Sequence, residues 1–414
     1  MPTTVFEYKV RDSNGKLIKG KIESESITAV GNKLRSMGYI PVNIQPQPKL
    51  DLRKELIIPG INDKANLKEV ALMSRQLATM VTAGLTLVRA LTIISDQLTS
   101  KVLQSAVNNV RRDLEQGVSF SRALEKHPKA FSPLYIAMVK AGEAGGSLDT
   151  TLLRLATTIE KQVELRRKVK SAMTYPAMVM SIVILVVIAL MIFVVPTFKK
   201  IYSTLKGTLP LPTQIVIDVS NDLATYWLAV FVAVVVGILI LFNRWIHTPD
   251  GRRKWDAFKL KMPIFGPLIH KISITRGTGT LASLLASGVG IIEALEITAD
   301  NAGNAIVAEA FRNAENTVRE GKGLAEALSV FSVIPNMVTQ MIETGEESGA
   351  LDDMLNRVTK FYEDEIETTV ASLSSLLEPL IIVFLGISIG FIVISMYLPM
   401  FGYISLVQKN GANA

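Results

Sequence analysis

The 414-residue sequence contains no cysteine, and its three histidines, His127, His247 and His270, lie far apart along the chain. Without cysteine there is no disulfide framework and no thiolate metal site. Isolated histidines are not typical of a histidine metal centre or of a catalytic triad. The sequence therefore argues against a disulfide-stapled protein, a zinc enzyme and a triad hydrolase.

The sequence also lacks a phosphate-binding loop, because no GxxxxGK segment followed by Ser or Thr is present. None of its three long apolar runs contains an ionisable residue. That absence argues against an intramembrane aspartyl protease and a proton-coupled transporter, which need charged groups inside the membrane. We expect no enzymatic activity, no cofactor and no nucleic-acid partner.

The sequence is rich in apolar residues, which make up 49% of the chain and give a mean hydropathy of +0.34. They concentrate in residues 177–195, 227–243 and 379–398, where runs near 20 residues match the thickness of a bilayer core. A buried core helix is the alternative, but core helices rarely stay apolar on every face for five turns. The pattern predicts three transmembrane helices.

The distribution of lysine and arginine predicts a topology. Basic residues crowd the segments before the first run and after the second, whereas residues 196–226 contain only three lysines. By the positive-inside rule, the N-terminus and residues 244–378 are cytoplasmic, and residues 196–226 and 399–414 are external. The cytoplasmic flank of the third run is acidic, but acidic residues count little in this rule.

The first 65 residues differ in character from the rest. Two alternating segments, a helical stretch from about Thr28 to Met37 and a further strand-like segment predict a small ββαβ domain at residues 1–45. Residues 46–65 contain several prolines and are predicted to be a linker.

The remainder of the chain is duplicated. GEAGGSLD at 142–149 and GEESGALD at 345–352 are 203 residues apart, and upstream apolar positions such as Leu77 and Leu281 are 204 apart. Each copy continues through a helical run, a proline and an apolar run. The sequence predicts a mainly α membrane protein with two repeated six-helix cytoplasmic bundles, residues 66–172 and 244–378, and a small α+β N-terminal domain.

The GExxGxLD motif allows three interpretations, which involve Glu143 and Asp149 in the first copy and Glu346 and Asp352 in the second. It is a tight helix–turn–helix in which glycines supply unusual backbone angles and the aspartate favours the helix dipole. Alternatively, the four acids form a surface for a partner. Carboxylates also suit Ca²⁺ or Mg²⁺, although two per copy are few for a metal site.

The apolar runs contain small residues at helical spacing, which permits close packing of helices in lipid. The predicted packing positions are Ala229, Ala233, Gly237, Gly386 and Gly390.

Two prolines at the membrane junctions, Pro176 and Pro379, each remove a helical hydrogen bond, so we expect a kink or break there. Glu378, beside the second proline, is a candidate contact for a partner subunit.

The order of these motifs resembles the inner-membrane platform proteins of type IV pilus and type II secretion machines, the GspF/PilC family. The resemblance rests on the Phe6–Gly20 segment, SRQLATMVTAGLTL at 74–87, and the paired GExxGxLD and proline-plus-span units. The second copy departs from the pattern at Gly279, where a basic residue matching Arg75 is expected. Arg75 is a candidate interface residue, but not for a role that needs an arginine in both copies.

The resemblance implies a non-enzymatic scaffold in the bacterial inner membrane. Its implied partners are a hexameric assembly ATPase, pilin or pseudopilin subunits, other inner-membrane assembly proteins, lipid, and further copies of itself as a dimer or trimer. A membrane transporter component is the rival class. It predicts polar residues within the spans, and the sequence has no charged residues there.

Overall fold

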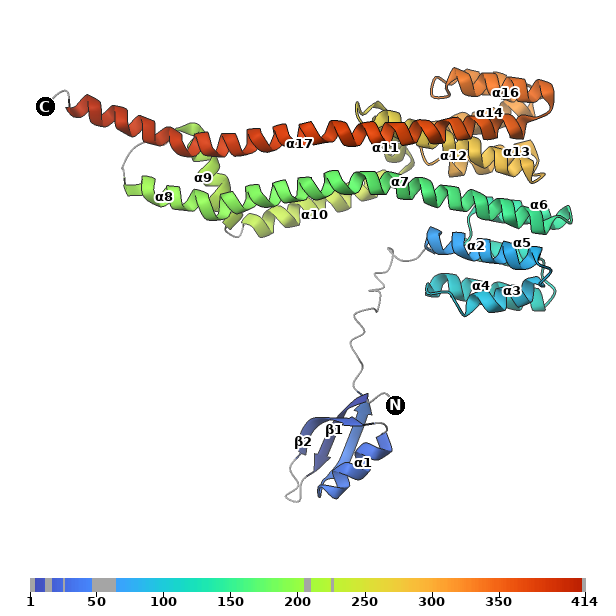
Figure 1. Ribbon diagram of the computed structural model, residues 1–414, viewed down its shortest axis with the longest axis horizontal. Coiled ribbons are helices and arrows are strands. Elements are labelled where there is room, and N and C mark those ends of the chain that lie inside the picture. The colour runs from blue at the N-terminus through green and yellow to red at the C-terminus, as the bar shows by residue number, and fades with distance from the viewer. Residues whose placement is uncertain are drawn as a thin grey trace. The chain divides into compact units, whose positions relative to one another are not determined.

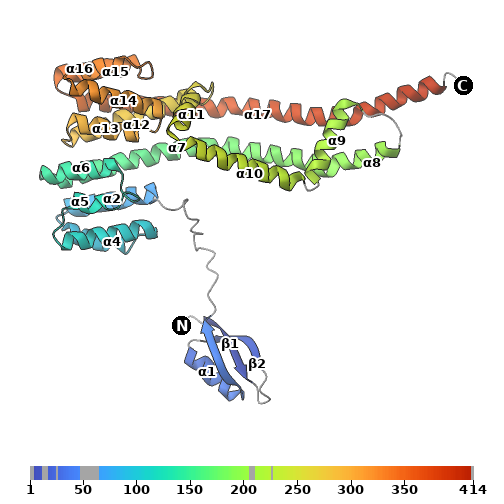
Figure 2. The same cartoon turned by 180° about the vertical axis from the view of Figure 1, so that it is seen from behind.

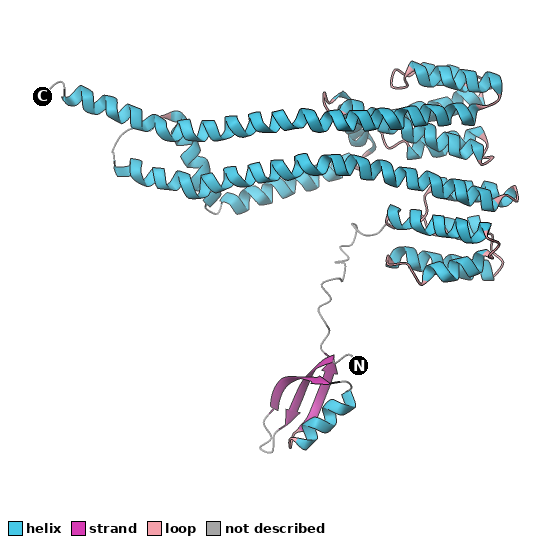
Figure 3. Ribbon diagram, in the orientation of Figure 1, coloured by secondary structure: helices cyan, strands magenta, loops and turns pink. Residues whose placement is uncertain are grey.

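The computed structural model describes residues 4–11, 17–24, 27–46, 65–204, 210–224 and 227–411, which divide into two units, Met1–Asn62 and Asp63–Ala414. Helices dominate the described residues, and strands occur only in the N-terminal unit among them (Figure 3). The mainly α fold predicted from the sequence is therefore confirmed. The predicted linker falls almost entirely outside the described residues.

The N-terminal unit is a three-stranded antiparallel sheet with one helix. Its elements are β1 (Thr4–Arg11), β2 (Leu17–Ser24), α1 (Ile27–Ser36) and β3 (Ile40–Pro46), and the sheet order is β2-β1-β3. Alternating residues of β1, Phe6 and Val10, turn to one face and pack on Val30 and Leu34 of α1. This unit has its own small core.

The first repeat contains six helices within residues 65–189, all of which the structure describes. They are α2 (Leu67–Thr82), α3 (Leu87–Ser95), α4 (Lys101–Glu115), α5 (Phe120–Glu125), α6 (Pro133–Ala144) and α7 (Leu148–Ala189). Side chains of Asn66, Thr86 and Ser100 accept hydrogen bonds at the N-termini of α2, α3 and α4. Local capping thus sets where these helices begin.

The second repeat has the same helix order within the described residues 227–411. Its helices are α12 (Gly266–Ala286), α13 (Ile291–Asn301), α14 (Ala305–Arg319), α15 (Leu324–Ser329), α16 (Asn336–Ser348) and α17 (Leu351–Gly411). Glycines with positive φ end corresponding helices, as with Gly146 (φ +67°) and Gly349 (φ +69°). The predicted duplication is confirmed in three dimensions.

The last helix of each repeat extends far beyond its bundle, and the two run side by side in the same direction (Figures 1 and 2). Among the described residues, two helical segments are long and apolar enough to cross a membrane, Leu148–Lys200 and Leu351–Pro399. The middle predicted span lies in α10 (Trp227–Ile246). Its segment Val236–Ile246 is apolar but shorter than the two candidate spans. The short helix α11 (Pro249–Lys261) then leads into the second repeat.

Neither junction proline breaks its helix. Pro176 lies inside α7, and Pro379 lies inside α17. The expectation of a break is wrong, because one lost hydrogen bond is tolerated in a helix that is otherwise continuous and supported by its neighbours. A bend at either proline stays a prediction.

Two further prolines, Pro196 and Pro399, lie near the far ends of the long helices, and each leaves a backbone carbonyl without a helical donor. Pro196 follows a π-helical turn, η1 (Leu190–Val194), and lies in α8 (Val195–Thr204). Proline has no N–H, so in this π register the carbonyl of Met191 lacks its helical donor. The Ser220 hydroxyl donates to that oxygen at 2.6 Å. Ser220 belongs to α9 (Leu211–Ala224), a helix packed between the two long ones.

The same helix α9 satisfies the corresponding carbonyl of the second repeat. Pro399 leaves the Ser395 carbonyl without its α-helical donor, and the Thr213 hydroxyl donates to it at 2.5 Å. Thr213, Ser220 and Ser395 are all buried, and Val216 and Ile217 of α9 pack with Ile392 and Met396 of α17. One face of α9 therefore links the far ends of both long helices.

We predict that Thr213→Val lowers the thermal stability of the full-length protein in detergent, whereas Thr213→Ser preserves it. The valine has the shape of threonine but leaves the buried Ser395 carbonyl unpaired, which costs about 1–3 kcal/mol. Thr197→Val is the matched control, because its hydroxyl bonds the Phe193 carbonyl of its own helix at an exposed site. Equal melting temperatures for Thr213→Val and Thr197→Val would contradict the assignment.

Candidate functional site at the junction of the two repeats

The glutamate of the first GExxGxLD motif caps a neighbouring helix. Glu143 accepts hydrogen bonds from the backbone N–H of Phe120 at 2.8 Å and of Ser121 at 3.2 Å, and from the Ser121 hydroxyl at 2.6 Å. These donors form the N-terminus of α5. Partial burial raises the pKa of Glu143, but the hydrogen bonds from Ser121 and Phe120 outweigh it and hold the pKa below its usual range.

The second motif repeats this contact. Glu346 accepts from the backbone N–H of Leu324 at 2.6 Å and of Ala325 at 3.0 Å, at the N-terminus of α15. Its carboxylate also lies close to Gly323, where an added Cβ would be 3.3 Å from Oε2. Both glutamates are therefore engaged inside their own bundles, and this contact supports the structural interpretation of the motif.

The glycines of the motif allow close helix packing. A Cβ on Gly142 would lie 2.6 Å from the Thr151 hydroxyl oxygen, and one on Gly345 would lie 2.8 Å from the Leu351 backbone. Helices α6 and α7, like α16 and α17, consequently fold back on each other over a very short turn.

The two aspartates lie in the first turns of α7 and α17, where the positive end of the helix dipole favours them. Asp149 is exposed and Asp352 is partly exposed. Among the described residues, no group of three His, Asp or Glu side chains is placed to hold a metal ion. The partner-surface interpretation of these aspartates stays a prediction.

Arg75 of α2 binds the last helix of its own repeat. Its Nε donates to Glu160 Oε1 at 2.7 Å, and its Nη2 donates both to Glu160 Oε2 and, at 3.0 Å, to the Thr157 hydroxyl. The hydrogen bonds raise the pKa of Arg75 and lower that of Glu160. Both side chains are more than a third exposed, so the pair contributes no more than about 1 kcal/mol.

The second repeat replaces this ion pair with close packing. At Gly279, which occupies the position of Arg75, an added Cβ would lie 3.1 Å from Thr359 Cγ2. Glu363, the counterpart of Glu160, instead lies 4.0 Å from Lys161 of the first repeat. Because the second repeat has no arginine at this position, Glu363 interacts with the other repeat and not with its own α12.

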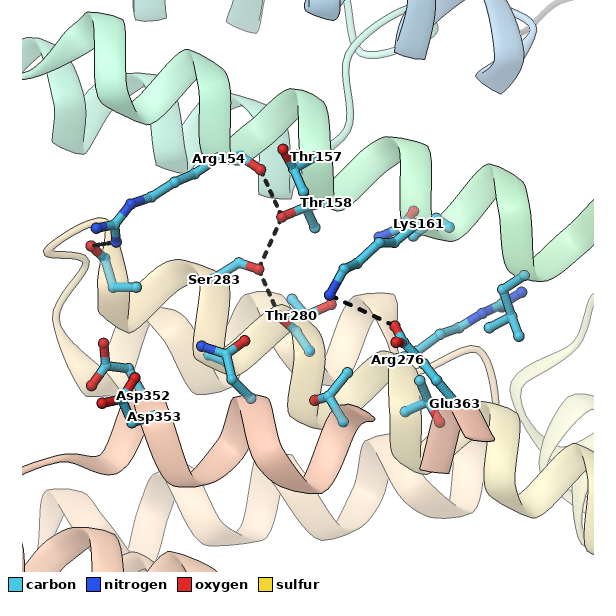
Figure 4. A pocket seen from close by; sticks show the side chains of 18 of the residues that line it. Arg154, Thr157, Thr158, Lys161, Arg276, Thr280, Ser283, Asp352, Asp353 and Glu363 are labelled. Carbon is cyan, nitrogen blue, oxygen red and sulfur yellow. Dashed lines mark hydrogen bonds and ion pairs between the residues drawn. The ribbon is translucent and has the colours of Figure 1, made fainter. Parts of the chain in front are cut away.

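A cavity of about 420 Å³ opens at this junction, between α7 on one side and α12 and α17 on the other (Figure 4). Its lining includes three basic and three acidic side chains, Arg154, Lys161, Arg276, Asp352, Asp353 and Glu363. Thr158 and Ser283 share a hydrogen bond of 3.0 Å across it, and Arg154 donates to the Ala286 carbonyl. The cavity, which we call the joint between the repeats, is therefore lined by polar and charged side chains of both repeats.

Arg276 is the least compensated charge of this joint. Burial lowers its pKa, and the nearby Arg166 lowers it further. Its guanidinium extends over Gly303, where an added Cβ would lie 2.6 Å from Nη1. Within the described part of the chain it has no carboxylate partner. Its counterpart in the first repeat is the exposed Leu72, and that of Gly303 is Thr99, so both features are specific to the second copy.

Ion pairs continue from the cavity along the long helices. Lys168 lies 2.8 Å from Glu367, and Lys271 lies 2.7 Å from Glu365. The hydrogen bond from Lys168 to Glu367 raises the pKa of the lysine above its usual range. The acidic flank of the third predicted span is thereby matched by the basic flank of the first. Leu165 and Val169 pack with Ile366, Val370 and Leu373 between these pairs.

The remaining predicted positions lie outside the junction. Glu378 is exposed beside Pro379. An added Cβ at Gly237, Gly386 or Gly390 would meet nothing within 4 Å, and Ala233 is exposed. Ala229 lies in α10, outside the described side chains. The three glycines do not pack the described helices of one chain together, and a packing role for these small residues stays a prediction.

Comparison with known proteins identifies the family. The family described as "Type II secretion system (T2SS), protein F" matches residues 73–196 and again residues 278–399. The family described as the N-terminal domain of this protein matches residues 1–45. The chain belongs to the type II secretion system protein F family. Members of this family are inner-membrane assembly components without enzymatic activity, so the expected absence of catalysis is confirmed by membership.

Curated relatives match over nearly their whole length. The type IV pilus assembly protein PilC of Thermus thermophilus is 43% identical over 98% of this chain and 99% of its own. PilC of Myxococcus xanthus is 38% identical over 98% of this chain and 96% of its own. The type II secretion system protein F of Pseudomonas aeruginosa is 33% identical over 97% and 99%. The resemblance inferred from sequence motifs is confirmed.

Sequence reasoning found Asp352 but missed most of the cavity. Lys161 and Glu363 are separated by 202 residues, and a surface lysine or glutamate in a helical pattern carries no sign of such a contact. A signal was present in the mismatches between the repeats. Arg276 against Leu72, and Gly279 against Arg75, both fall on the joint.

We predict that Glu143→Ala lowers thermal stability more than Asp149→Ala, by the roughly 1–2 kcal/mol expected for a lost helix cap. Since the folded pKa of Glu143 is depressed, its contribution is complete above the unfolded value of about 4.3 and is lost as pH falls through the folded pKa. The difference in free energy of unfolding between the native protein and Glu143→Gln should therefore become smaller as pH falls from the unfolded pKa through the folded pKa of Glu143. A gap that is constant with pH would refute the cap.

Proposed function

We propose that this protein is the inner-membrane platform of a type IV pilus assembly machine, coupling a cytoplasmic hexameric assembly ATPase to the insertion of pilin subunits into a filament. The observation that carries this is its full-length similarity to proteins named type IV pilus assembly proteins. The identity to them is higher than to the secretion protein compared above. Platforms of secretion or DNA-uptake pseudopili are the alternative, and a transporter component is a weaker one.

The proposed placement in the membrane follows from the apolar helices and the basic flanks. Residues 177–195, 227–243 and 379–398 span the bilayer, with the N-terminal unit and both bundles in the cytoplasm. Helix α9 then lies near the external face, where it joins the ends of α7–α8 and α17. Exposed apolar side chains such as Leu185, Phe193, Ile387 and Phe391 would face lipid or pilin.

The proposed coupling uses the two long helices as rigid connections. Each begins at a GExxGxLD turn and continues without interruption past the junction cavity toward the membrane. The ATPase would contact the cytoplasmic bundles, and a displacement there would reach the spans through α7 and α17. Other inner-membrane assembly proteins are further proposed partners.

We predict that reporter fusions at residues 60, 210, 300 and 410 read inside, outside, inside and outside. The physical reason is the excess of lysine and arginine on segments that stay in the cytoplasm. Activity of alkaline phosphatase and fluorescence of a cytoplasmic reporter at each site provide the measurement. An inside signal at residue 210 would be incompatible with three spans.

We predict that Asp149→Asn combined with Asp352→Asn reduces filament number about tenfold, a coupling change of about 1.4 kcal/mol, at an unchanged protein level. These aspartates begin the long helices and have no described side-chain partner, so their loss should leave the fold intact. Glu320→Gln, an exposed acid at the end of α14, is the control. Filament counts and immunoblots of the same strain decide, and wild-type filament numbers would remove these acids from coupling.

A further inference from the structure

The charged side chains that line the joint gather at its two ends. One end holds Arg154, Asp352 and Asp353, and the other holds Lys161, Arg276 and Glu363 (Figure 4). Helix α12 runs between these ends, and about 15 Å of helix separates Arg276 from Ala286. The joint is therefore an elongated space whose two ends differ in their charges.

The Arg276 end carries positive charge that no acid neutralises. Lys161 lies 4.0 Å from Glu363, which leaves the half-buried Arg276 unmatched. Arg166 of α7 is close enough to lower the pKa of Arg276 in addition to the effect of burial. Within the described part of the chain, neither arginine has a hydrogen bond or a carboxylate partner. Two guanidinium groups from different repeats thus repel each other across the joint, and an anion between them would remove that cost.

The fold of the repeated bundle does not require Arg276. The first repeat forms the same bundle with Leu72 at this position and Thr99 at the position of Gly303. In the second repeat, a Cβ at Gly303 (φ +77°) would lie 2.6 Å from Nη1 of Arg276. The glycine therefore leaves room for the guanidinium, and both residues belong to the joint and not to the shared architecture.

The opposite end of the joint offers acceptors. Asp352 and Asp353 lie in the first turn of α17, where the helix dipole favours their ionised form. Neither side chain has a hydrogen bond or an ion pair among the described residues, and Arg154 at this end is already bound to the Ala286 carbonyl. Two carboxylates are thus available to accept hydrogen bonds from a ligand that carries hydroxyl or amino groups.

We propose that the joint binds a small soluble phosphate monoester, with its phosphate between Arg276 and Arg166 and donor groups of its body at Asp352 and Asp353. A phosphate monoester carries about two negative charges at pH 7, which match the two unpaired guanidinium groups. The planar fork of each arginine fits phosphate oxygens. The cavity volume of about 420 Å³ lies in the range of small-molecule sites.

The ligand would connect the two repeats. Its phosphate contacts α7 of the first repeat through Arg166 and α12 of the second through Arg276, and its body contacts α17. The contact between the bundles therefore becomes tighter when the joint is occupied, because binding to the joined form stabilises that form.

A phospholipid headgroup is the other possible source of the phosphate. Arg166 precedes the first predicted span at Ala177 by about 16 Å of helix. The headgroup layer on one side of a bilayer is roughly 5–7 Å thick. On the proposed placement in the membrane, on which this step rests, the joint lies beyond the headgroups. We therefore assign the site to a soluble ligand.

Calorimetric titration of the full-length protein in detergent tests the site, with adenosine monophosphate (AMP) as the phosphate monoester. Inorganic phosphate and adenosine represent its two parts. We expect saturable binding of AMP, weaker binding of phosphate and none of adenosine. Absence of binding by both AMP and phosphate would overturn the proposal, as would adenosine binding as tightly as AMP. Tighter binding of dihexanoylphosphatidylglycerol than of AMP would replace the soluble ligand by a lipid.

Arginine variants test the phosphate end. Arg276→Gln and Arg166→Gln should each weaken AMP and phosphate binding about tenfold, since each removes a charge-assisted hydrogen bond. Arg167→Gln is the matched control, because Arg167 is an exposed neighbour that does not line the joint. Equal weakening by all three changes would indicate general attraction to a basic surface and overturn the proposal.

The stability of the unliganded protein separates binding from a structural role. Without ligand, Arg276→Gln should not lower the melting temperature, because it removes a partly buried charge that has no partner. A lower melting temperature together with unchanged AMP affinity would show that Arg276 is structural, which contradicts the proposal.

The aspartate end has its own test. Asp352→Asn combined with Asp353→Asn should weaken AMP binding severalfold and leave phosphate binding unchanged, since only the body of AMP reaches these acids. Unchanged AMP affinity would refute the proposed orientation. All these readouts use purified protein and no filaments, so a negative result leaves the proposed function untouched.

Discussion

The lateral contact between α7 and α17 is the interaction on which the rest of the described helical unit depends. Leu165 and Val169 pack on Ile366, Val370 and Leu373, and lysine–glutamate pairs flank this apolar contact. Because each long helix is also the last helix of its bundle, fixing the two helices fixes the bundles and the apolar segments together. The apolar packing supplies most of the stability here, since exposed ion pairs contribute little.

Two of the differences between the repeats, Gly279 against Arg75 and Arg276 against Leu72, lie beside that contact. The first copy keeps Arg75 on Glu160, which binds α2 to α7 within one bundle. The second copy has Gly279 there, and Glu363 is turned toward Lys161 of the other bundle. A perfect duplication would have presented two identical, self-satisfied surfaces. With glycine at position 279, Glu363 has no arginine partner within its own repeat and lies 4.0 Å from Lys161 of the other repeat, and Gly279 lines the cavity.

The sequence predicted the parts of this structure that local forces determine. The shared offset of 203–204 residues predicted the two repeats, and the glycines of the GExxGxLD motif predicted the tight turns that precede the long helices. Contacts between distant residues escaped it. Glu143 was offered as an acidic surface residue, yet it caps α5, because a carboxylate near unpaired N–H groups gives no periodic signal. For Pro176 the sequence predicts a kink or a break, and the helix continues through this proline without a break.

The far ends of the long helices, at α9, and their ends at the cavity are held by different physical means. At α9, buried hydroxyls of Thr213 and Ser220 satisfy carbonyls that prolines leave open, and such short neutral bonds in an apolar setting are insensitive to salt. At the cavity, Lys161 and the partly exposed Glu363 lie 4.0 Å apart, in a contact that water and salt screen. The contacts of α9 therefore hold α7–α8 and α17 together in a way that salt does not change, whereas the contact at the cavity weakens as the salt concentration rises.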